Sequence, residues 1–504
     1  MKHMKKFMAL FAALALVMAM AVPAFADDPT YSITISNGSG TYKAYQIFSG
    51  TLNSDGQLGN IEWGTGVDST KIATYSKTAK EAAESLTDAG AAEDFATTIA
   101  DYLGDTYTSS SGNSFTGLTA GYYLIMNDTV ASGEAYTKFI LAVTANQTVN
   151  AKVDVPSFEK KVKDINDSTE TSYSDWKDSA DHDIGDNVPF LLKGKIANNF
   201  ASYKNAYTFI FHDKQSAGLT FKPETVVVTV ETTDNDTVTL TKDVDYTITT
   251  SGLTDDDTFE ITVSNLKALP NGKTAKAGGY VYVEYQSELN QNAVIGSTGN
   301  PNEARLGFSN NPNGTGTGET PEDEVIVFTY KVDADKTNNL NQPLAGAAFE
   351  LFKKDTNGNW VSVGVVNATK GTDSEGNVTY TLINDTATHF EWKGIDDGTY
   401  MIREVITPAG YNTIADQVFN VTATHSDGDK PSFSSLSGDA QSGSVITFTP
   451  NNNDGSLSTT IVNNAGTTLP GTGGIGTTIF YVVGGGLMVA AAVLLVAKKR
   501  MENK

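Results

Sequence analysis

Residues 398–411 read GTYMIREVITPAGY, a strand pattern that ends in a proline–glycine turn. Side chains alternate between the two faces of a strand, so Tyr400, Ile402 and Glu404 share one face. Glu404 therefore continues a row that begins apolar. Other strand patterns recur along the chain between turns rich in Asp, Asn and Gly. These patterns predict a mainly β protein.

The strand patterns divide the chain into three predicted domains. Residues 27–152 combine strands with one helical stretch at 78–102, which predicts an α+β domain. Residues 153–310 are almost entirely strand-like and predict a β-sandwich. Residues 324–466 repeat that pattern, and the stretch 311–323 between them is rich in Gly, Asn, Thr and Pro, as linkers are. We therefore expect tandem immunoglobulin-like sandwiches after an α+β N-terminal domain.

Both ends of the chain carry targeting signals. Residues 1–26 place three lysines before an apolar run that ends in Ala-Phe-Ala, the layout of a cleaved secretory signal peptide. Residues 478–497 are almost wholly apolar, long enough to span a membrane, and are followed by Lys-Lys-Arg. The sequence therefore predicts a secreted chain whose precursor is held in the membrane at its C-terminus.

The composition excludes several classes of function. With 59 acidic and 35 basic residues, the net charge of −24 argues against nucleic-acid partners, whose phosphates would be repelled. The absence of cysteine excludes disulfides and thiolate metal sites. The histidines show no metal-binding spacing and no Gly-x-Ser-x-Gly elbow is present, so we predict no metal site, no cofactor and no hydrolase activity. The five histidines are His3, His182, His212, His389 and His425.

A short motif precedes the C-terminal apolar span. It consists of Leu469, Pro470, Gly471, Thr472 and Gly473. The order of this motif, the span and the basic tail, within residues 467–504, resembles the sorting signal of sortase substrates. The resemblance implies that a membrane sortase thiolate attacks the Thr472 carbonyl, expels Gly473 and waits for an amine to resolve the acyl-enzyme. The chain is then a substrate and not an enzyme.

A lysine, a glutamate and an asparagine are predicted to face the interior of the third domain. Lys331 continues the row of alternate residues that starts at Val325, and Asn463 shares a strand face with Ile461. Glu404 is the inward-facing acid described above. Burial costs an ammonium or a carboxylate several kcal/mol unless it is neutralised or paired. The group is therefore either a buried salt bridge or a reactive pair of neutral amine and protonated acid.

The reactive alternative would form an isopeptide bond. A neutral lysine can attack the asparagine side-chain carbonyl and release ammonia while the acid donates a hydrogen bond. The surrounding runs, Lys-Val-Asp at 331–333, Leu-Ala-Gly-Ala-Ala-Phe at 344–349 and the terminal Ile-Val-Asn, are similar to the collagen-adhesin B-type domain. That resemblance implies Lys331 as nucleophile, Glu404 as acid and Asn463 as acceptor. Lys336, in a polar turn, is the alternative nucleophile.

The second domain offers a similar set. Lys160, Asp213 and Asn310 each lie in an otherwise apolar row of alternate residues. The strand that runs into Ser-Asn-Asn-Pro resembles the A-type collagen-adhesin and pilin middle domain, which implies nucleophile, acid and acceptor roles in that order. Lys161 and Asn302 are the alternatives for the lysine and the asparagine, and a salt bridge is again the simpler interpretation.

The first domain is predicted to lack such a bond. Its strand at 121–127, Gly-Tyr-Tyr-Leu-Ile-Met-Asn, has no glutamate at the corresponding place. Pilins of the resembled family place their polymerising lysine at the end of this domain, commonly in a Tyr-Pro-Lys motif, which is absent here. Lys152, just before Pro156, is the candidate, and the new bond would join it to Thr472 of another subunit.

The resemblance implies a structural role. We expect a shaft subunit of a covalent, sortase-polymerised pilus that supports adhesion, displayed on the cell wall of a Gram-positive bacterium. The implied partners are pilus-specific and housekeeping sortases, identical subunits, tip and basal pilins, peptidoglycan and a host or other cell-surface ligand. The alternative is an ancillary or solitary wall-anchored adhesin that is not polymerised through its own lysine.

Overall fold

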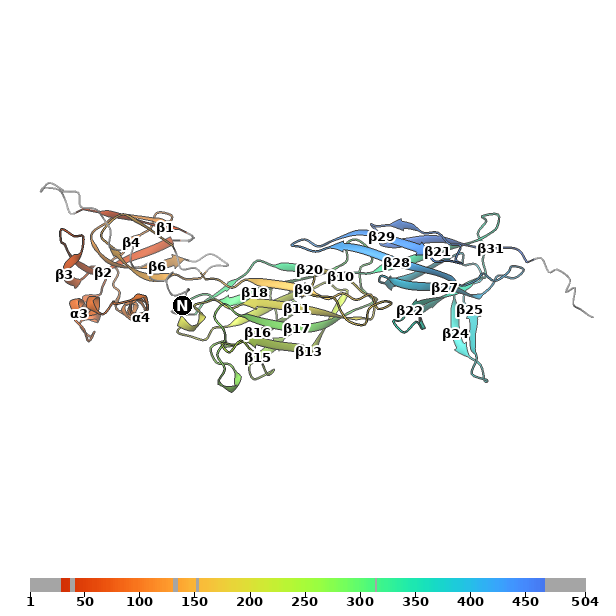
Figure 1. Cartoon of the computed structure of the whole chain (residues 1–504), viewed down its shortest axis with the longest axis horizontal. Coiled ribbons are helices and arrows are strands. Elements are labelled where there is room, and N and C mark those ends of the chain that lie inside the picture. Colours follow the sequence, from red (N-terminus) through yellow and green to blue (C-terminus); the bar gives the residue numbers. More distant parts are fainter. Residues whose placement is uncertain (1–28, 37–40, 130–134, 151–153, 313–314, 467–504) are drawn as a thin grey trace, which may run out of the picture.

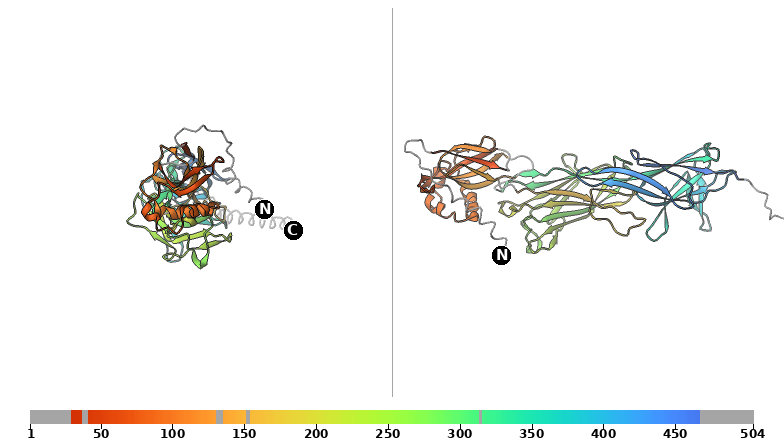
Figure 2. Two further views of the ribbon diagram at one scale, coloured as in Figure 1. Left: turned by 90° about the vertical axis from the view of Figure 1, so that its left-hand side faces the viewer. Right: turned by 45° about the horizontal axis from the view of Figure 1, so that its top comes forward.

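The computed structural model describes residues 29–36, 41–129, 135–150, 154–312 and 315–466. Three β-rich bodies follow one another along its long axis (Figure 1), and the second and third are in direct contact (Figure 2). The predicted signal peptide, Lys152, the sorting motif and the predicted membrane span lie outside the described residues. None of the described helices is long and apolar enough to cross a membrane. The prediction of a mainly β chain with several domains is confirmed.

The first body contains two sheets and a group of short helices. One sheet has the order β5-β1-β8, and the other has the order β3-β2-β6-β7 with β4 beside β2. The strands are β1 (Tyr31–Ser36), β2 (Thr41–Leu52), β3 (Leu58–Trp63), β4 (Thr108–Ser109), β5 (Ser114–Leu118), β6 (Gly121–Thr129), β7 (Lys138–Val143) and β8 (Gln147–Asn150). The helices are α2 (Ser69–Ile72), α3 (Ala79–Glu84), α4 (Ala89–Ile99) and the 3₁₀ turn η1 (Ala100–Tyr102).

The helical stretch predicted at 78–102 is several helices rather than one. Thr78 caps α3 through a capping box with Glu81, and Asp88 accepts a hydrogen bond from the Ala91 N–H at the start of α4. An Asp in this position favours a new helix start over continuation of the old one. The chain therefore turns between Ser85 and Asp88, and both helices cover the β2-β3 side of the body.

The second body is a sandwich of two sheets with orders β14-β13-β17-β11-β9 and β10-β20-β18-β12-β16-β15, the latter with β19 beside β18. Its core is rich in aromatic and β-branched side chains from both inner faces. The strands are β9 (Phe158–Val162), β10 (Ser179–Asp181), β11 (Asn187–Lys195), β12 (Phe209–Gln215), β13 (Leu219–Glu231), β14 (Thr237–Thr239), β15 (Tyr246–Thr249), β16 (Phe259–Val263), β17 (Tyr280–Leu289), β18 (Asn300–Ser309), β19 (Thr317–Glu319) and β20 (Asp323–Phe328). Two 3₁₀ turns, η2 (Phe200–Ser202) and η3 (Pro270–Gly272), lie in its loops.

The boundary between the second and third bodies differs from the predicted linker at 311–323. Strand β19 pairs with β18, and β20 pairs with both β18 and β10. The segment after β18 therefore completes the second sandwich instead of separating two domains. The third body begins after Thr329, which is fully buried. Composition suggested a linker because turn residues surround these short strands.

The third body is also a sandwich. Its sheets have the orders β26-β21-β31-β30 and β23-β22-β27-β28-β29, and the hairpin β24-β25 projects from one side (Figure 1). The first strand of this body, β21, pairs in parallel with the last strand, β31. The strands are β21 (Tyr330–Asn338), β22 (Ala348–Lys354), β23 (Trp360–Val366), β24 (Ala368–Thr372), β25 (Val378–Leu382), β26 (His389–Ile395), β27 (Gly398–Ile406), β28 (Gln417–Ser426), β29 (Ser432–Ala440), β30 (Thr449–Asn451) and β31 (Ser456–Asn463).

Candidate isopeptide crosslinking sites

The second sandwich buries a lysine beside an aspartate. Lys160 lies on β9 and Asp213 on β12, and both side chains are inaccessible to solvent. The Lys160 Nζ lies 2.5 Å from Asp213 Oδ2 and 3.0 Å from the hydroxyl of Tyr285 on β17. Since β9 and β12 belong to opposite sheets, the contact crosses the core of the sandwich.

Burial pushes this pair toward its neutral forms. Removal from water lowers the pKa of Lys160, although the neighbouring Asp213 opposes that change. Removal from water likewise raises the pKa of Asp213. A neutral amine carries the free lone pair that a nucleophile needs, and a protonated carboxyl can donate a hydrogen bond. The site therefore favours the protonation states that isopeptide formation requires.

Asn302 completes this group. Its Nδ2 donates to the Tyr285 hydroxyl over 2.9 Å, and that hydroxyl donates to Asp213 Oδ2 over 2.7 Å. On β18 it lies diagonally across from Asp213, because Gln215 pairs with Asn302. Two buried oxygens here have no hydrogen-bond partner, Asp213 Oδ1 and Asn302 Oδ1. A protonated Asp213 has a hydroxyl to donate, and the Asn302 amide oxygen is a buried acceptor without a partner in the same group.

Asn310 is not part of the group, which corrects the first choice of acceptor. It lies beyond β18, where its Nδ2 donates to the Thr317 carbonyl and its own carbonyl accepts from the Tyr136 N–H. Six residues of extended chain separate this level of the sheet from Asp213, or about 20 Å at the rise of a strand. Strand alternation places Asn302 and Asn310 on one face, but it cannot tell which lies level with the acid.

Lys161, the alternative lysine, points away from the core. It pairs with Asp178 at the edge of the sandwich, where about a quarter of its side chain is exposed. The structure therefore brings Lys160 and Asp213 together, as expected, and places Asn302 rather than Asn310 beside them. Tyr285 was missed by the sequence analysis. Its signal is present in the inward row of alternate residues on β17, Val281, Val283 and Tyr285.

The third sandwich buries Lys336 rather than Lys331. Lys336 on β21 is 1% exposed, and its Nζ donates to the carbonyls of Thr337 (3.0 Å) and Ile461 (3.2 Å). No carboxylate of the described residues forms a salt bridge with it. Burial lowers the pKa of Lys336 to about 8, with the charge of Glu404 opposing the change. About a tenth of the amine is therefore neutral at pH 7, far more than for an ordinary lysine.

Asn463 and Glu404 meet beside this lysine. The Asn463 Nδ2 donates to both carboxylate oxygens of Glu404, at 2.8 and 3.0 Å, and Asn463 is fully buried. In the parallel pair of β21 and β31, Lys336 pairs with Ile461 and Asn338 with Asn463, so the lysine and the asparagine are diagonal neighbours. The Asn463 Oδ1 has no hydrogen-bond partner. A half-turn of this amide would present its oxygen to a protonated Glu404.

Lys331, the first-choice nucleophile, faces outward, so the prediction that it points into the interior is wrong. Its Nζ lies 2.7 Å from Glu391 Oε1, and that hydrogen bond raises the pKa of Lys331. The cause is a break in strand alternation at Thr329. Val325 is buried in the second sandwich, whereas Tyr330 and the alternate residues after it are buried in the third. A face assigned on one side of this crossing cannot be carried to the other.

The first body shows no comparable group within its described residues. Its buried polar side chains there are Gln46, Asn127 and Thr137, and none of its described lysines is buried. Lys43, for example, forms a surface ion pair with Asp128. This arrangement agrees with the sequence pattern, which lacks an acid on the Gly-Tyr strand. The absence of an internal bond in this body stays a prediction.

Three regions of the chain match known protein families. Residues 184–312 match the Gram-positive pilin backbone subunit 2, Cna-B-like domain, residues 330–432 match a prealbumin-like fold domain, and residues 461–503 match the LPXTG cell wall anchor motif. The chain carries the modules of a Gram-positive backbone pilin. These modules are structural rather than enzymatic, and the anchor motif assigns the chain to the cell wall.

The chain is also similar to individual surface proteins and pilins of Gram-positive bacteria. The trypsin-resistant surface T6 protein of Streptococcus pyogenes serotype M6 is 22% identical over 454 residues, which cover 80% of this chain and 73% of that protein. The structure of the T6 backbone pilin, described as modular with three domains, superposes with a TM-score of 0.52 at 18% identity, covering 88% of this chain and all of the other. The major pilin SpaD of Corynebacterium diphtheriae gives a TM-score of 0.48 at 17% identity, covering 87% and 98%. The first superposition shows a shared fold.

Proposed function

We propose that this backbone pilin is the shaft subunit of a covalent pilus, and that each of its two sandwiches is closed by one Lys–Asn isopeptide bond. The bonds join Lys160 to Asn302 in the second sandwich and Lys336 to Asn463 in the third. The observation that carries the proposal is that each sandwich buries one lysine near an asparagine and an acid. A chain without cysteine gains from these bonds the mechanical closure that disulfides provide elsewhere.

The chemistry balances without a cofactor. The neutral Nζ of Lys160 attacks Cγ of Asn302, while protonated Asp213 hydrogen-bonds the developing oxyanion. The Nζ–Cγ bond forms, the Cγ–Nδ2 bond breaks, and Nδ2 leaves as ammonia after taking a proton from the attacking amine. The hydroxyl of Tyr285 holds acid and amide in place through its two hydrogen bonds. In the third sandwich Glu404 is the acid that corresponds to Asp213, with Lys336 as the nucleophile and Asn463 as the acceptor.

Polymerisation would use two positions outside the described residues. A sortase would cleave after Thr472 and pass its carbonyl to Lys152 of the next subunit, or to peptidoglycan at the base. The LPXTG match at residues 461–503 supports the first half of this scheme. The choice of Lys152 is supported only by its position between the first body and the second sandwich.

Two measurements test the proposal separately. Intact mass of the processed chain should fall short of the sequence value by two ammonia losses, about 17 Da each. The variants Asp213→Ala and Glu404→Ala should each restore one loss. A full sequence mass in the parent chain would rule out both internal bonds.

The intermolecular bond has its own assay. Boiling in detergent should leave a ladder of multimers from wild-type cells and none from cells that carry Lys152→Arg. A ladder that persists in the variant would refute Lys152. A wild-type chain that runs only as a monomer would favour the ancillary adhesin.

A further inference from the structure

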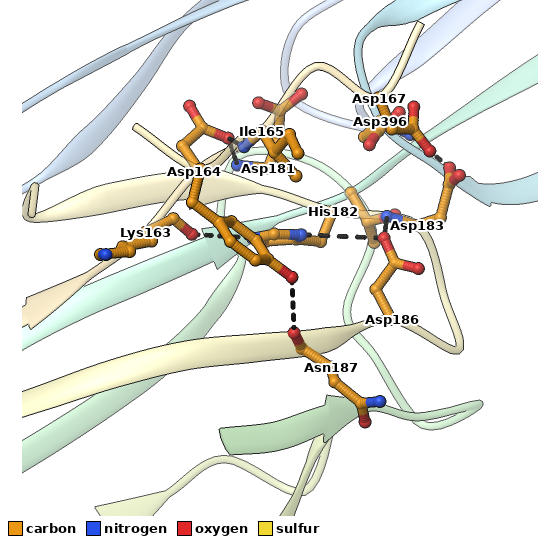
Figure 3. A network of polar contacts seen from close by, with 12 residues as sticks. Lys163, Asp164, Ile165, Asp167, Asp181, His182, Asp183, Asp186, Asn187 and Asp396 are labelled. Atoms are coloured by element: carbon orange, nitrogen blue, oxygen red, sulfur yellow. Dashed lines mark hydrogen bonds and ion pairs between the residues drawn. The ribbon is translucent and has the colours of Figure 1, made fainter. Parts of the chain in front are cut away.

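The seam between the second and third sandwiches is crowded with ionisable side chains. Figure 3 shows Asp164 and Asp181 together on one side of His182, and a second acidic group on the other side. His425 reaches this seam from β28 of the third sandwich, which lies against β10 of the second. The seam therefore brings together side chains of the second and the third sandwich.

The described residues contain three clusters with the side-chain types of metal ligands, and two of them already hold a cationic side chain. The Lys353 Nζ lies within 2.8 Å of Asp183 in the cluster that Asp183 forms with Asp167 and Asp396. The Arg305 guanidinium lies 2.9 Å from Asp257 in the cluster around His212. An internal cation makes an added ion unnecessary at either place.

The third cluster holds no lysine or arginine side chain between its carboxylates, as far as the described residues show. Its candidate ligand atoms, on Asp164, Asp181 and His425, all lie within 4.8 Å of one another. Lys177 is the nearest cationic side chain of the described residues, at 3.5 Å from Asp164 Oδ2, but it is 39% exposed and stands at the rim. A cavity of about 320 Å³ opens beside the three residues and is also lined by Asp397.

The imidazole of His425 is held in one orientation. Ser179 Oγ donates its only proton to the Ser426 carbonyl over 2.9 Å, so the contact of 2.6 Å with His425 requires Nδ1 to be the donor. The other nitrogen, Nε2, is then directed at the two carboxylates. A histidine whose far nitrogen is fixed by a hydrogen bond is the usual arrangement of a metal ligand.

The distances fit a bound ion better than a direct hydrogen bond. Nε2 of His425 lies 3.4 Å from Asp181 Oδ1 and 3.7 Å from Asp164 Oδ2, whereas charge-assisted hydrogen bonds are about 2.7–2.9 Å long. Zinc bonds of about 2.0–2.2 Å in a tetrahedron place neighbouring ligand atoms about 3.4 Å apart. One nitrogen and two carboxylates are a ligand set that suits zinc, because calcium prefers oxygen alone.

An independent observation points to the same place. The hydroxyl of Tyr330 is fully buried and has no hydrogen-bond partner. After burial itself, the charges of Asp181, Asp397 and Asp164 raise the pKa of Tyr330 most, so these carboxylates lie within electrostatic range of its hydroxyl. A hydrated cation held by these carboxylates would give the buried Tyr330 hydroxyl a hydrogen-bond partner.

We propose that Asp164, Asp181 and His425 form a divalent-cation site, suited to zinc, that ties the second sandwich to the third. Two ligands come from the second sandwich and one from the third, so a bound ion would restrain bending at the seam. The acidic group around Lys353 fastens the same seam a short distance away. The rod would thus be stiffened by ionic contacts between sandwiches in addition to covalent bonds within them.

Zinc binding to the processed chain tests this site. Equilibrium dialysis against zinc should show one strongly bound ion per chain, and cobalt in its place should give the visible absorption of a tetrahedral site. His425→Gln should weaken binding at least about 100-fold, and Ser179→Ala, which frees only the ring orientation, about 10–100-fold. The matched control is His389→Gln, since that histidine is 59% exposed in a surface pair with Asp335.

Each outcome decides the proposal. Loss of binding in His425→Gln and Ser179→Ala, but not in His389→Gln, would support it. Absence of zinc binding in the parent chain would overturn it, as would equal binding in the parent and both seam variants. Calcium binding that His425→Gln leaves unchanged would also overturn it, because the histidine would then not be a ligand. Should His425→Gln fold poorly by circular dichroism, Ser179→Ala still gives the answer.

Discussion

Lys336 offers a test of its burial through the pH dependence of stability. In the variant Glu404→Gln the acid of the third sandwich is replaced by a group of the same shape, so the isopeptide bond should not form and Lys336 should keep a free amine. Burial lowers the pKa of that amine to about 8, from an ordinary value of 10.5. Glu404 opposes the change, so its removal should leave the pKa at or below about 8.

The sign follows from where the proton resides. Between pH 8 and 10.5 the unfolded chain holds a proton on Lys336 and the folded chain does not, so the free energy of unfolding rises with pH across this window. At 1.36 kcal/mol per pH unit, the total rise is about 3 kcal/mol. Below pH 8 both states are protonated, and the full cost of burying the charge remains.

The assay is urea unfolding at pH 7 and pH 10.5, followed by the fluorescence of Trp360 and Trp392. Both tryptophans lie in the third sandwich. The substitutions Trp63→Phe and Trp176→Phe remove the signal of the other two bodies. The matched control is the same background with Glu404 intact, in which an amide nitrogen cannot titrate. A variant whose stability changes with pH no more than the control would refute the burial of a free Lys336.

Three further predictions concern the identity of the reacting groups. In Asn302→Ala the shortfall of the measured mass from the sequence mass should be smaller by about 17 Da than in the parent chain. In Asn310→Ala this shortfall should not change, because Asn310 lies far from the acid along the sheet. In Lys336→Arg the shortfall should likewise be smaller by about 17 Da, and in Lys331→Arg it should not, since Lys331 faces solvent and pairs with Glu391. Tyr285→Phe should slow bond formation in a refolding time course followed by mass, and should cost about 1–3 kcal/mol before the bond forms, because Asp213 and Asn302 each lose a buried hydrogen bond.

Opposite results would be equally informative. A mass deficit that disappears in Asn310→Ala and persists in Asn302→Ala would restore the original choice of acceptor. The same pattern for Lys331 and Lys336 would mean that the outward lysine reaches the amide. A Tyr285→Phe chain that closes its bond at the parent rate would limit the tyrosine to packing.

The sequence could predict the sandwiches and the kinds of residue at each site, because a polar residue in an apolar row of alternate strand positions can be recognised from the sequence. It could not predict positions that depend on register. Asn302 and Asn310 share one strand face, and only the pairing of β12 with β18 shows that Asn302 is the diagonal neighbour of Asp213. Lys331 was misassigned because alternation restarts at Thr329, where the chain passes between sandwiches.

The residue cluster at the seam between the second and third sandwiches could not be predicted from the sequence for a different reason. Asp164, Asp181 and His425 are separated by up to 261 positions, and no spacing relates them. Their meeting depends on how two folded sandwiches pack, which local pattern does not encode. The linker predicted at 311–323 was inferred from composition alone. Short strands between turn residues have the composition of a linker, and only their pairing with β18 shows that they belong to the second sandwich.

Peptide mapping by tandem mass spectrometry of pilin extracted from the cell wall tests the crosslinks most directly. After proteolysis, the proposal requires two branched peptides, one joining Lys160 to Asn302 and one joining Lys336 to Asn463, each lighter by one ammonia. Recovery of both lysines and both asparagines in linear peptides of unmodified mass would contradict it.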